Sequence, residues 1–127
     1  MVDRSREKQL ATAMVVVGLI FLVGVYPLIV LWPSGWVWHD GGQSNYLQMI
    51  VGVYATLGVF LLIGARHPMD NLSLVWFTVW SSVVHAIIMA VQALADGGER
   101  GHLIGDVPAL FVVAIVLAAL TPRAPRA

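Results

Sequence analysis

Residues Leu72 to Leu94, which read LSLVWFTVWSSVVHAIIMAVQAL, decide the fold of this chain. The segment is apolar except for one histidine and a few hydroxyl and amide side chains, and it is longer than the ~20 residues that a transmembrane helix needs. An ionisable group at the centre of such a helix costs at least ~2 to 3 kcal/mol in hydrocarbon. We therefore expect His85 to face the interior of a helix bundle.

The three- and four-residue spacing of a helix divides this segment into two faces. The face that contains His85 is polar and also carries Thr78, Ser81, Ser82, Met89, Gln92 and Asp96, with Asn71 farther back. The opposite face is predicted to meet lipid and consists of Val75, Val79, Val83, Ile87 and Val91. Beside the polar face, Thr78, Ser82, Ala86 and Ala90 form a ladder of small residues. Such a ladder lets a second helix approach closely.

The whole chain has the composition of an integral membrane protein. Of its 127 residues, 59% are hydrophobic and only 11% are charged, with a mean hydropathy of +0.84, whereas about a quarter of the residues of a globular protein are charged. Four apolar segments are predicted to span a membrane, at about residues 10–32, 46–64, 72–94 and 103–120. Since the loops are short, we predict an all-α, integral membrane, four-helix antiparallel bundle that forms a single domain over residues 1–127.

The basic residues predict the orientation of this bundle. Six of the seven fall on one side of the predicted membrane, and only Arg100 falls on the other; the six are Arg4, Arg6, Lys8, Arg66, Arg123 and Arg126. The positive-inside rule then places both termini in the cytoplasm. We interpret the first span as a retained anchor because its apolar run is longer than a signal core. Pro27 should kink or end it near its outer end.

Composition also excludes several kinds of protein. The absence of cysteine rules out a disulfide framework, a thiolate nucleophile and a zinc ribbon. A net charge of zero argues against a nucleic-acid partner, since phosphate binding needs clustered basic residues. We expect no cofactor and no metal, because His39, His102, Asp96 and Glu99 in the predicted outer loops lack metal-ligand spacing. These loop residues are simplest to interpret as a solvated rim.

The candidate site lies in the outer half of the bundle. At about 1.5 Å per residue, His85 and Asp106 lie roughly 20 Å and 22 Å above the inner ends of their helices, and Tyr26 and Tyr54 lie roughly 24 Å and 15 Å above theirs. We therefore predict a polar, ligand-binding recess formed by His85, Asp106, Tyr26, Tyr54 and Gln92. The hypothesis requires His85 and Asp106 to interact directly or through one water, because either group unpaired in the bundle would be penalised.

Both central residues also have structural explanations. In GDVPAL, an aspartate two residues before Pro108 is a good helix start. The fourth helix would then begin at Asp106 and contain about 15 residues, near 22 Å, with HLIG folded back on the bundle. For His85, three explanations stay open: a structural hydrogen bond to a serine, tyrosine or carbonyl group, a role in proton handling or ligand binding, and metal ligation.

The segments WPSGW, IVGVYATLGVFLL, WFTVWSSVVHAIIMAVQAL and ERGHLIGDVP together resemble a group of small four-span bacterial membrane proteins known only as a domain of unknown function. The resemblance covers nearly the whole chain. It implies a bacterial cytoplasmic membrane location and four helices, and it brings no activity, substrate or cofactor.

Three functions are compatible with these features. We favour a non-enzymatic small-ligand or lipid-binding protein, or an accessory membrane protein, with membrane lipids and a homo-oligomer or larger membrane complex as partners. The second is an oligomeric proton-coupled transporter that uses His85 and Asp106. The third is a membrane-embedded enzyme with His85 as general acid or base, which no recognised catalytic signature supports.

Overall fold

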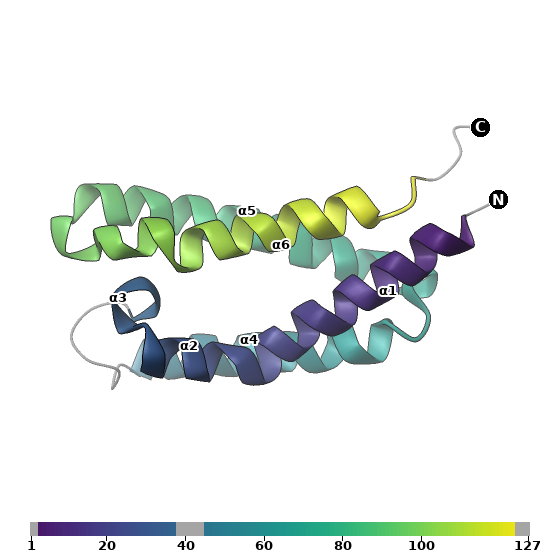
Figure 1. Ribbon diagram of the computed structural model, residues 1–127, viewed down its shortest axis with the longest axis horizontal. Helices are drawn as coiled ribbons and strands as arrows, with labels where there is room; N and C mark the ends of the chain where they lie inside the picture. The colour runs from purple at the N-terminus through teal and green to yellow at the C-terminus, as the bar shows by residue number, and fades with distance from the viewer. Residues whose placement is uncertain (1–2, 38–44, 124–127) are drawn as a thin grey trace.

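Every regular element of the part of the chain that the computed structural model describes, residues 3–37 and 45–123, is helical. The elements in order are α1 (Arg4–Leu19), a π-helical turn η1 (Ile20–Gly24), α2 (Val25–Leu31), α3 (Pro33–Trp36), α4 (Asn45–Gly64), a 3₁₀ turn η2 (Pro68–Asn71), α5 (Leu72–Ala95), a 3₁₀ helix η3 (Gly97–Ile104) and α6 (Asp106–Leu120). The long helices lie side by side, with both termini at one end (Figure 1). The predicted all-α bundle is confirmed.

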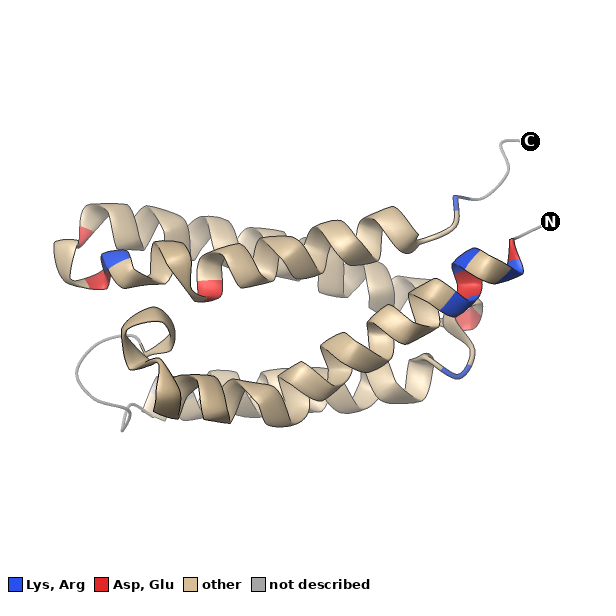
Figure 2. Cartoon of the chain, viewed as in Figure 1, with Lys and Arg blue, Asp and Glu red and all other residues tan. Residues whose placement is uncertain are grey.

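Three helical stretches are long and apolar enough to cross a membrane: Arg4–Leu31, Pro68–Ala95 and Gly97–Leu120. A fourth apolar stretch, Gln48–Gly64, is shorter. Most charged residues lie toward the two ends of the bundle, with one acidic position farther in, and long uncharged stretches lie between them (Figure 2). By length and composition the chain has the character of a membrane protein.

The first helical stretch changes direction at a wide turn. The π-helical turn η1 ends just before Pro27 in α2, and a proline cannot donate the backbone hydrogen bond that its position requires. A π turn combined with a proline is a common cause of a helix kink, and α1 and α2 point in different directions in Figure 1. The helix is therefore kinked near Pro27 but continues to Leu31.

Two glycines allow this kinked stretch to pack closely against α4. A Cβ atom added to Gly18 would lie 2.9 Å from the carbonyl oxygen of Gly58, and one added to Gly58 would lie 2.5 Å from the carbonyl oxygen of Gly18. Real Cβ atoms do not approach this closely. Glycine at both positions therefore lets the two backbones touch, as small residues do between membrane helices.

The long helix α5 packs along α6, and most of the predicted ladder of small residues is buried. Thr78, Ser82 and Ala86 are all buried, which agrees with close approach of the neighbouring helix. The predicted lipid face is wrong in part, because Val75 and Val79 are also buried. The exposed face instead carries Trp76, Phe77, Trp80, Val84, Ile87, Ile88, Val91 and Leu94.

The reason for this error is helix geometry. A helix has 3.6 residues per turn, so a series at every fourth position turns by about 40° at each step. The series that begins at Val75 starts inside the buried arc and leaves it by Ile87, which is 50% exposed. The same drift places His85 at the edge of the buried arc, where its side chain is half-buried.

Candidate functional site

A hydrogen bond between Tyr54 and His85 joins α4 to α5. It links the hydroxyl group of Tyr54 to Nδ1 of His85. The two rings are nearly parallel, with an interplanar angle of 27° and 5.6 Å between centroids, and Phe21 packs edge-on against Tyr54 at 4.9 Å. The three rings therefore pack in series and connect η1 and α4 with α5.

A second polar cluster is built around His102, which is only 1% exposed. Its Nδ1 lies 3.0 Å from Oδ1 of Asp106, and its Nε2 lies 3.0 Å from the carbonyl oxygen of Val37 and 3.1 Å from Oε2 of Glu99. Both carboxyl groups are also buried. Because each ring nitrogen has an acceptor, His102 connects η3 with the start of α6 and with the end of α3.

Sequence spacing explains why these groups meet. Glu99, His102 and Asp106 are three and four residues apart, so a helical backbone brings them to one face. Gly101 and Gly105 have the same four-residue spacing. A Cβ atom at either position would overlap a carbonyl oxygen of α3, that of Ser34 for Gly101 and that of Gly35 for Gly105. The glycines therefore allow α3 to close onto η3 and cover the cluster.

Asp106 of the second cluster also interacts with the first cluster, because its charge acts electrostatically on both Tyr54 and His85. Within the predicted pair, His85 is hydrogen-bonded to Tyr54 and Asp106 is hydrogen-bonded to His102. The fourth long helix begins at Asp106 and has 15 residues, which agrees with the explanation of Asp106 as a helix start. However, its N-cap residue is Gly105, without a side-chain cap.

Two residues of the predicted recess lie elsewhere. Tyr26 is 70% exposed, and Gln92 is also exposed. The rise of about 1.5 Å per residue gives the height of a residue along a helix but not its direction around the axis. For Tyr26, the π turn η1 alters the rotation of every residue that follows it, and for Gln92 the position on α5 lies outside the buried arc.

Sequence analysis missed the importance of His102 and Glu99, which it assigned to a solvated rim. The signal was present in the repeated spacing of acidic, histidine and glycine residues over ERGHLIGD. His39, which belongs to a predicted outer loop, lies outside the described residues. Over residues 3–37 and 45–123, no group of three or more His, Cys, Asp or Glu side chains has a geometry that could hold a metal ion.

These features define a class of protein: a small helical bundle of membrane type with buried histidine and carboxyl groups at one end. A family model described as a family of unknown function (DUF6632) matches residues 4–125. The chain belongs to this family. No curated protein and no solved structure matches it.

Proposed function

We propose that this protein is a non-enzymatic, four-span membrane protein that binds a small polar ligand in the outer half of its bundle, at His85 and Tyr54 and next to Asp106. The observation that carries the proposal is the Tyr54–His85 hydrogen bond between α4 and α5. It uses Nδ1 of the imidazole, and no hydrogen bond from the described residues reaches Nε2. That nitrogen is therefore the group that a ligand would meet.

The charge around this site favours a ligand with a cationic group, such as a small protonated amine. The described outer end carries three carboxylates, Asp96, Glu99 and Asp106, and one arginine, Arg100. The charge of Asp106 acts on both site residues. Aromatic faces such as those of Phe21 and Tyr54 also attract cations, by about 0.5 to 2 kcal/mol.

The proposed setting is the bacterial cytoplasmic membrane, with both termini in the cytoplasm. The six-to-one distribution of basic residues supports this orientation. The helix α4 has 20 residues, which corresponds to about 30 Å and matches the hydrocarbon core. Membrane lipids are partners in this setting, and a homo-oligomer or larger membrane complex is part of the same proposal.

Proton transport is a second candidate function, because titratable side chains extend through the outer half. Hydrogen bonds or ion pairs join Tyr54 to His85 and join Asp106 through His102 to Glu99. The inner half argues against a continuous pathway. Its core consists mainly of apolar side chains, and no titratable side chain of the described residues is buried there; fully buried apolar members are Leu10, Met14, Leu61, Val75 and Leu117. Binding is therefore favoured over transport.

Nitrogen-15 NMR of the histidine rings in detergent tests the binding proposal. The chain has four histidines, so replacement of each assigns its signals. Addition of a series of small protonated amines should shift the Nε2 signal of His85 and leave that of the exposed His67 unchanged, while neutral alcohols of the same shape should act more weakly. Tyr54→Phe should reduce the shift, and Tyr26→Phe should not.

Two results would count against the proposal. If no amine moves the His85 signal, or if Tyr54→Phe and Tyr26→Phe behave alike, the site does not bind this class of ligand. If proteoliposomes carry protons at a rate that His85→Ala abolishes, transport replaces binding as the function.

A further inference from the structure

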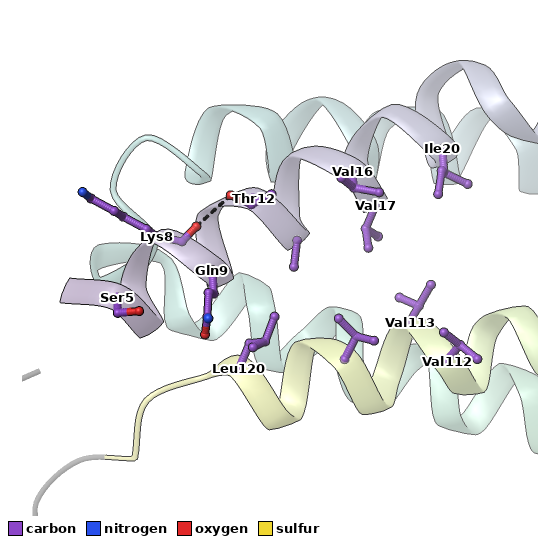
Figure 3. Close-up of a pocket in the computed structure, with 12 residues that line it drawn as sticks. Ser5, Lys8, Gln9, Thr12, Val16, Val17, Ile20, Val112, Val113 and Leu120 are labelled. Atoms are coloured by element: carbon purple, nitrogen blue, oxygen red, sulfur yellow. Dashed lines mark hydrogen bonds between the residues drawn. The ribbon is translucent and has the colours of Figure 1, made fainter. Parts of the chain in front are cut away.

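A groove separates α1 and α6 near the end of the bundle that carries both termini. Its volume is about 650 Å³. The deeper part is apolar, with Val16, Val17 and Ile20 on one side and Val112 and Val113 on the other (Figure 3). This groove lies at the opposite end of the bundle from the His102 cluster.

The groove becomes polar toward the terminal end. Ser5, Lys8, Gln9 and Thr12 line it there, and Figure 3 shows these side chains grouped at one end and the valines at the other. The side chain of Lys8 is exposed, and no ion pair of the described residues involves it. In Figure 3 the side chain points outward from the terminal end, so its ammonium group is exposed beside the groove and available to an anion there.

The length of the groove corresponds to one leaflet of a bilayer. From Lys8 to Ile20 the helix rises by roughly 18 Å at 1.5 Å per residue. Half of a hydrocarbon core of about 30 Å is about 15 Å. A chain that lies in the groove with its polar head at Lys8 would therefore reach the middle of the membrane.

The charge of this end of the bundle is positive. Among the described residues, five basic side chains lie there, Arg4, Arg6, Lys8, Arg66 and Arg123, together with three acidic ones, Asp3, Glu7 and Asp70 (Figure 2). Basic residues near a membrane surface attract anionic lipids. The groove has a basic polar end and apolar walls, and it therefore matches an amphiphile with a negatively charged head.

We propose that this groove binds one acyl chain of an anionic phospholipid, with the lipid phosphate at Lys8. A second copy of α1 in the same orientation would match the apolar walls but would place its own basic residues against the basic end of the groove. The proposal is independent of the ligand site at His85, which lies at the other end of the bundle.

A site-specific fluorescent reporter tests the proposal in the full chain. Because the sequence has no cysteine, Val116→Cys carries a single bimane label in the groove, and Ile115→Cys, 65% exposed, is the matched control on the same helix. The labelled proteins are reconstituted in phosphatidylcholine vesicles that contain brominated phosphatidylglycerol or brominated phosphatidylcholine. At position 116 we expect the anionic lipid to quench at a several-fold lower fraction than the zwitterionic lipid, and at position 115 we expect equal quenching.

Two substitutions that each remove one positive charge distinguish a bound headgroup from general attraction of anionic lipid to the basic end of the bundle. Lys8→Gln should lower the preference for phosphatidylglycerol at position 116 about fivefold, which corresponds to the roughly 1 kcal/mol expected for one basic residue at a membrane surface. Arg6 does not line the groove, so Arg6→Gln should lower this lipid preference much less. Native mass spectrometry of the unlabelled proteins should show the same order in retained phosphatidylglycerol.

Several results would overturn the proposal. Equal quenching by the two lipids at position 116 would show that the groove does not select the anionic head. Equal losses in Lys8→Gln and Arg6→Gln would mean diffuse attraction without a site. Protection of position 116 from both lipids, together with cross-linking between copies of the chain, would identify a second copy as the occupant.

Discussion

His102 shows how a histidine can be satisfied at the end of a membrane bundle. It is 1% exposed, and its two ring nitrogens face two carboxyl groups and a carbonyl oxygen. Buried ionisable groups are penalised unless they are paired and hydrogen-bonded. Pairing with His102 therefore reduces the cost of burying Glu99 and Asp106, and pairing with the two carboxyl groups reduces the cost of burying His102.

His102→Ala should destabilise the fold, because it leaves two buried carboxyl groups without their shared partner. Breaking a buried pair in this way typically costs 3 to 5 kcal/mol, and we expect a loss of about 3 kcal/mol. Reversible unfolding in mixed detergent micelles measures it. His67→Ala is the matched control, since His67 is exposed, and a similar loss in both variants would contradict the proposed role of the cluster.

Tyr54→Phe tests the hydrogen bond that joins α4 to α5. The substitution removes one hydroxyl group and keeps the ring that packs against Phe21. We expect a loss of about 1 kcal/mol in the free energy of unfolding, which is typical of one hydrogen bond. Tyr26→Phe makes the same chemical change at a position that is 70% exposed and should have no measurable effect. Equal results for the two would show that the bond contributes nothing to stability.

At the scale of elements, the contact between α3 and η3 depends on glycine. A Cβ atom on Gly105 would overlap the carbonyl oxygen of Gly35, whereas one on Gly97 would meet nothing within 4 Å. A backbone carbonyl cannot move aside as a flexible side chain can. This contact holds α3 over the His102 cluster, so packing and polar interactions at this end depend on each other.

Gly105→Ala should therefore open the contact between α3 and η3. We expect a loss of about 1 to 3 kcal/mol, as for other overpacked sites, together with faster hydrogen exchange at Gly35 and Trp36. Gly97→Ala is the control with the same added methyl group and should leave both quantities unchanged. Slow exchange in Gly105→Ala would show that α3 tolerates the extra volume.

The buried arc of α5 makes a second prediction at this scale. Val79 is 5% exposed and Val91 is 62% exposed, so the same substitution tests opposite faces of one helix. Val79→Leu should cost about 1 to 3 kcal/mol through overpacking, and Val91→Leu should be neutral. The fraction of folded, monodisperse protein after purification gives a first comparison, and unfolding in mixed micelles gives the magnitude. The opposite order would mean that the helix is rotated from the position described.

At the scale of the whole molecule, the distribution of charge predicts how the bundle sits in a membrane. A reporter fused after Ala127 should be active in the cytoplasm, and a reporter inserted near Gly42 should be active outside, because six of seven basic residues fall on the terminal side. Alkaline phosphatase and green fluorescent protein fusions measure the two locations. An external reporter after Ala127 would contradict four spans with both termini inside.

The sequence by itself determined the helical class and the long apolar stretches, because these depend on local composition and on residues that are neighbours in the chain. Only the tertiary structure decided which side chains meet. The kink at the π turn η1 and the rotation of α5 place Tyr26 and Gln92 on the surface and bring Tyr54 to His85. Close contacts between distant segments, such as Gly18 with Gly58 and Gly35 with Gly105, also belong to the tertiary structure. The rise per residue gives the depth of a residue along its helix, but its direction around the axis follows from the packing of the other helices.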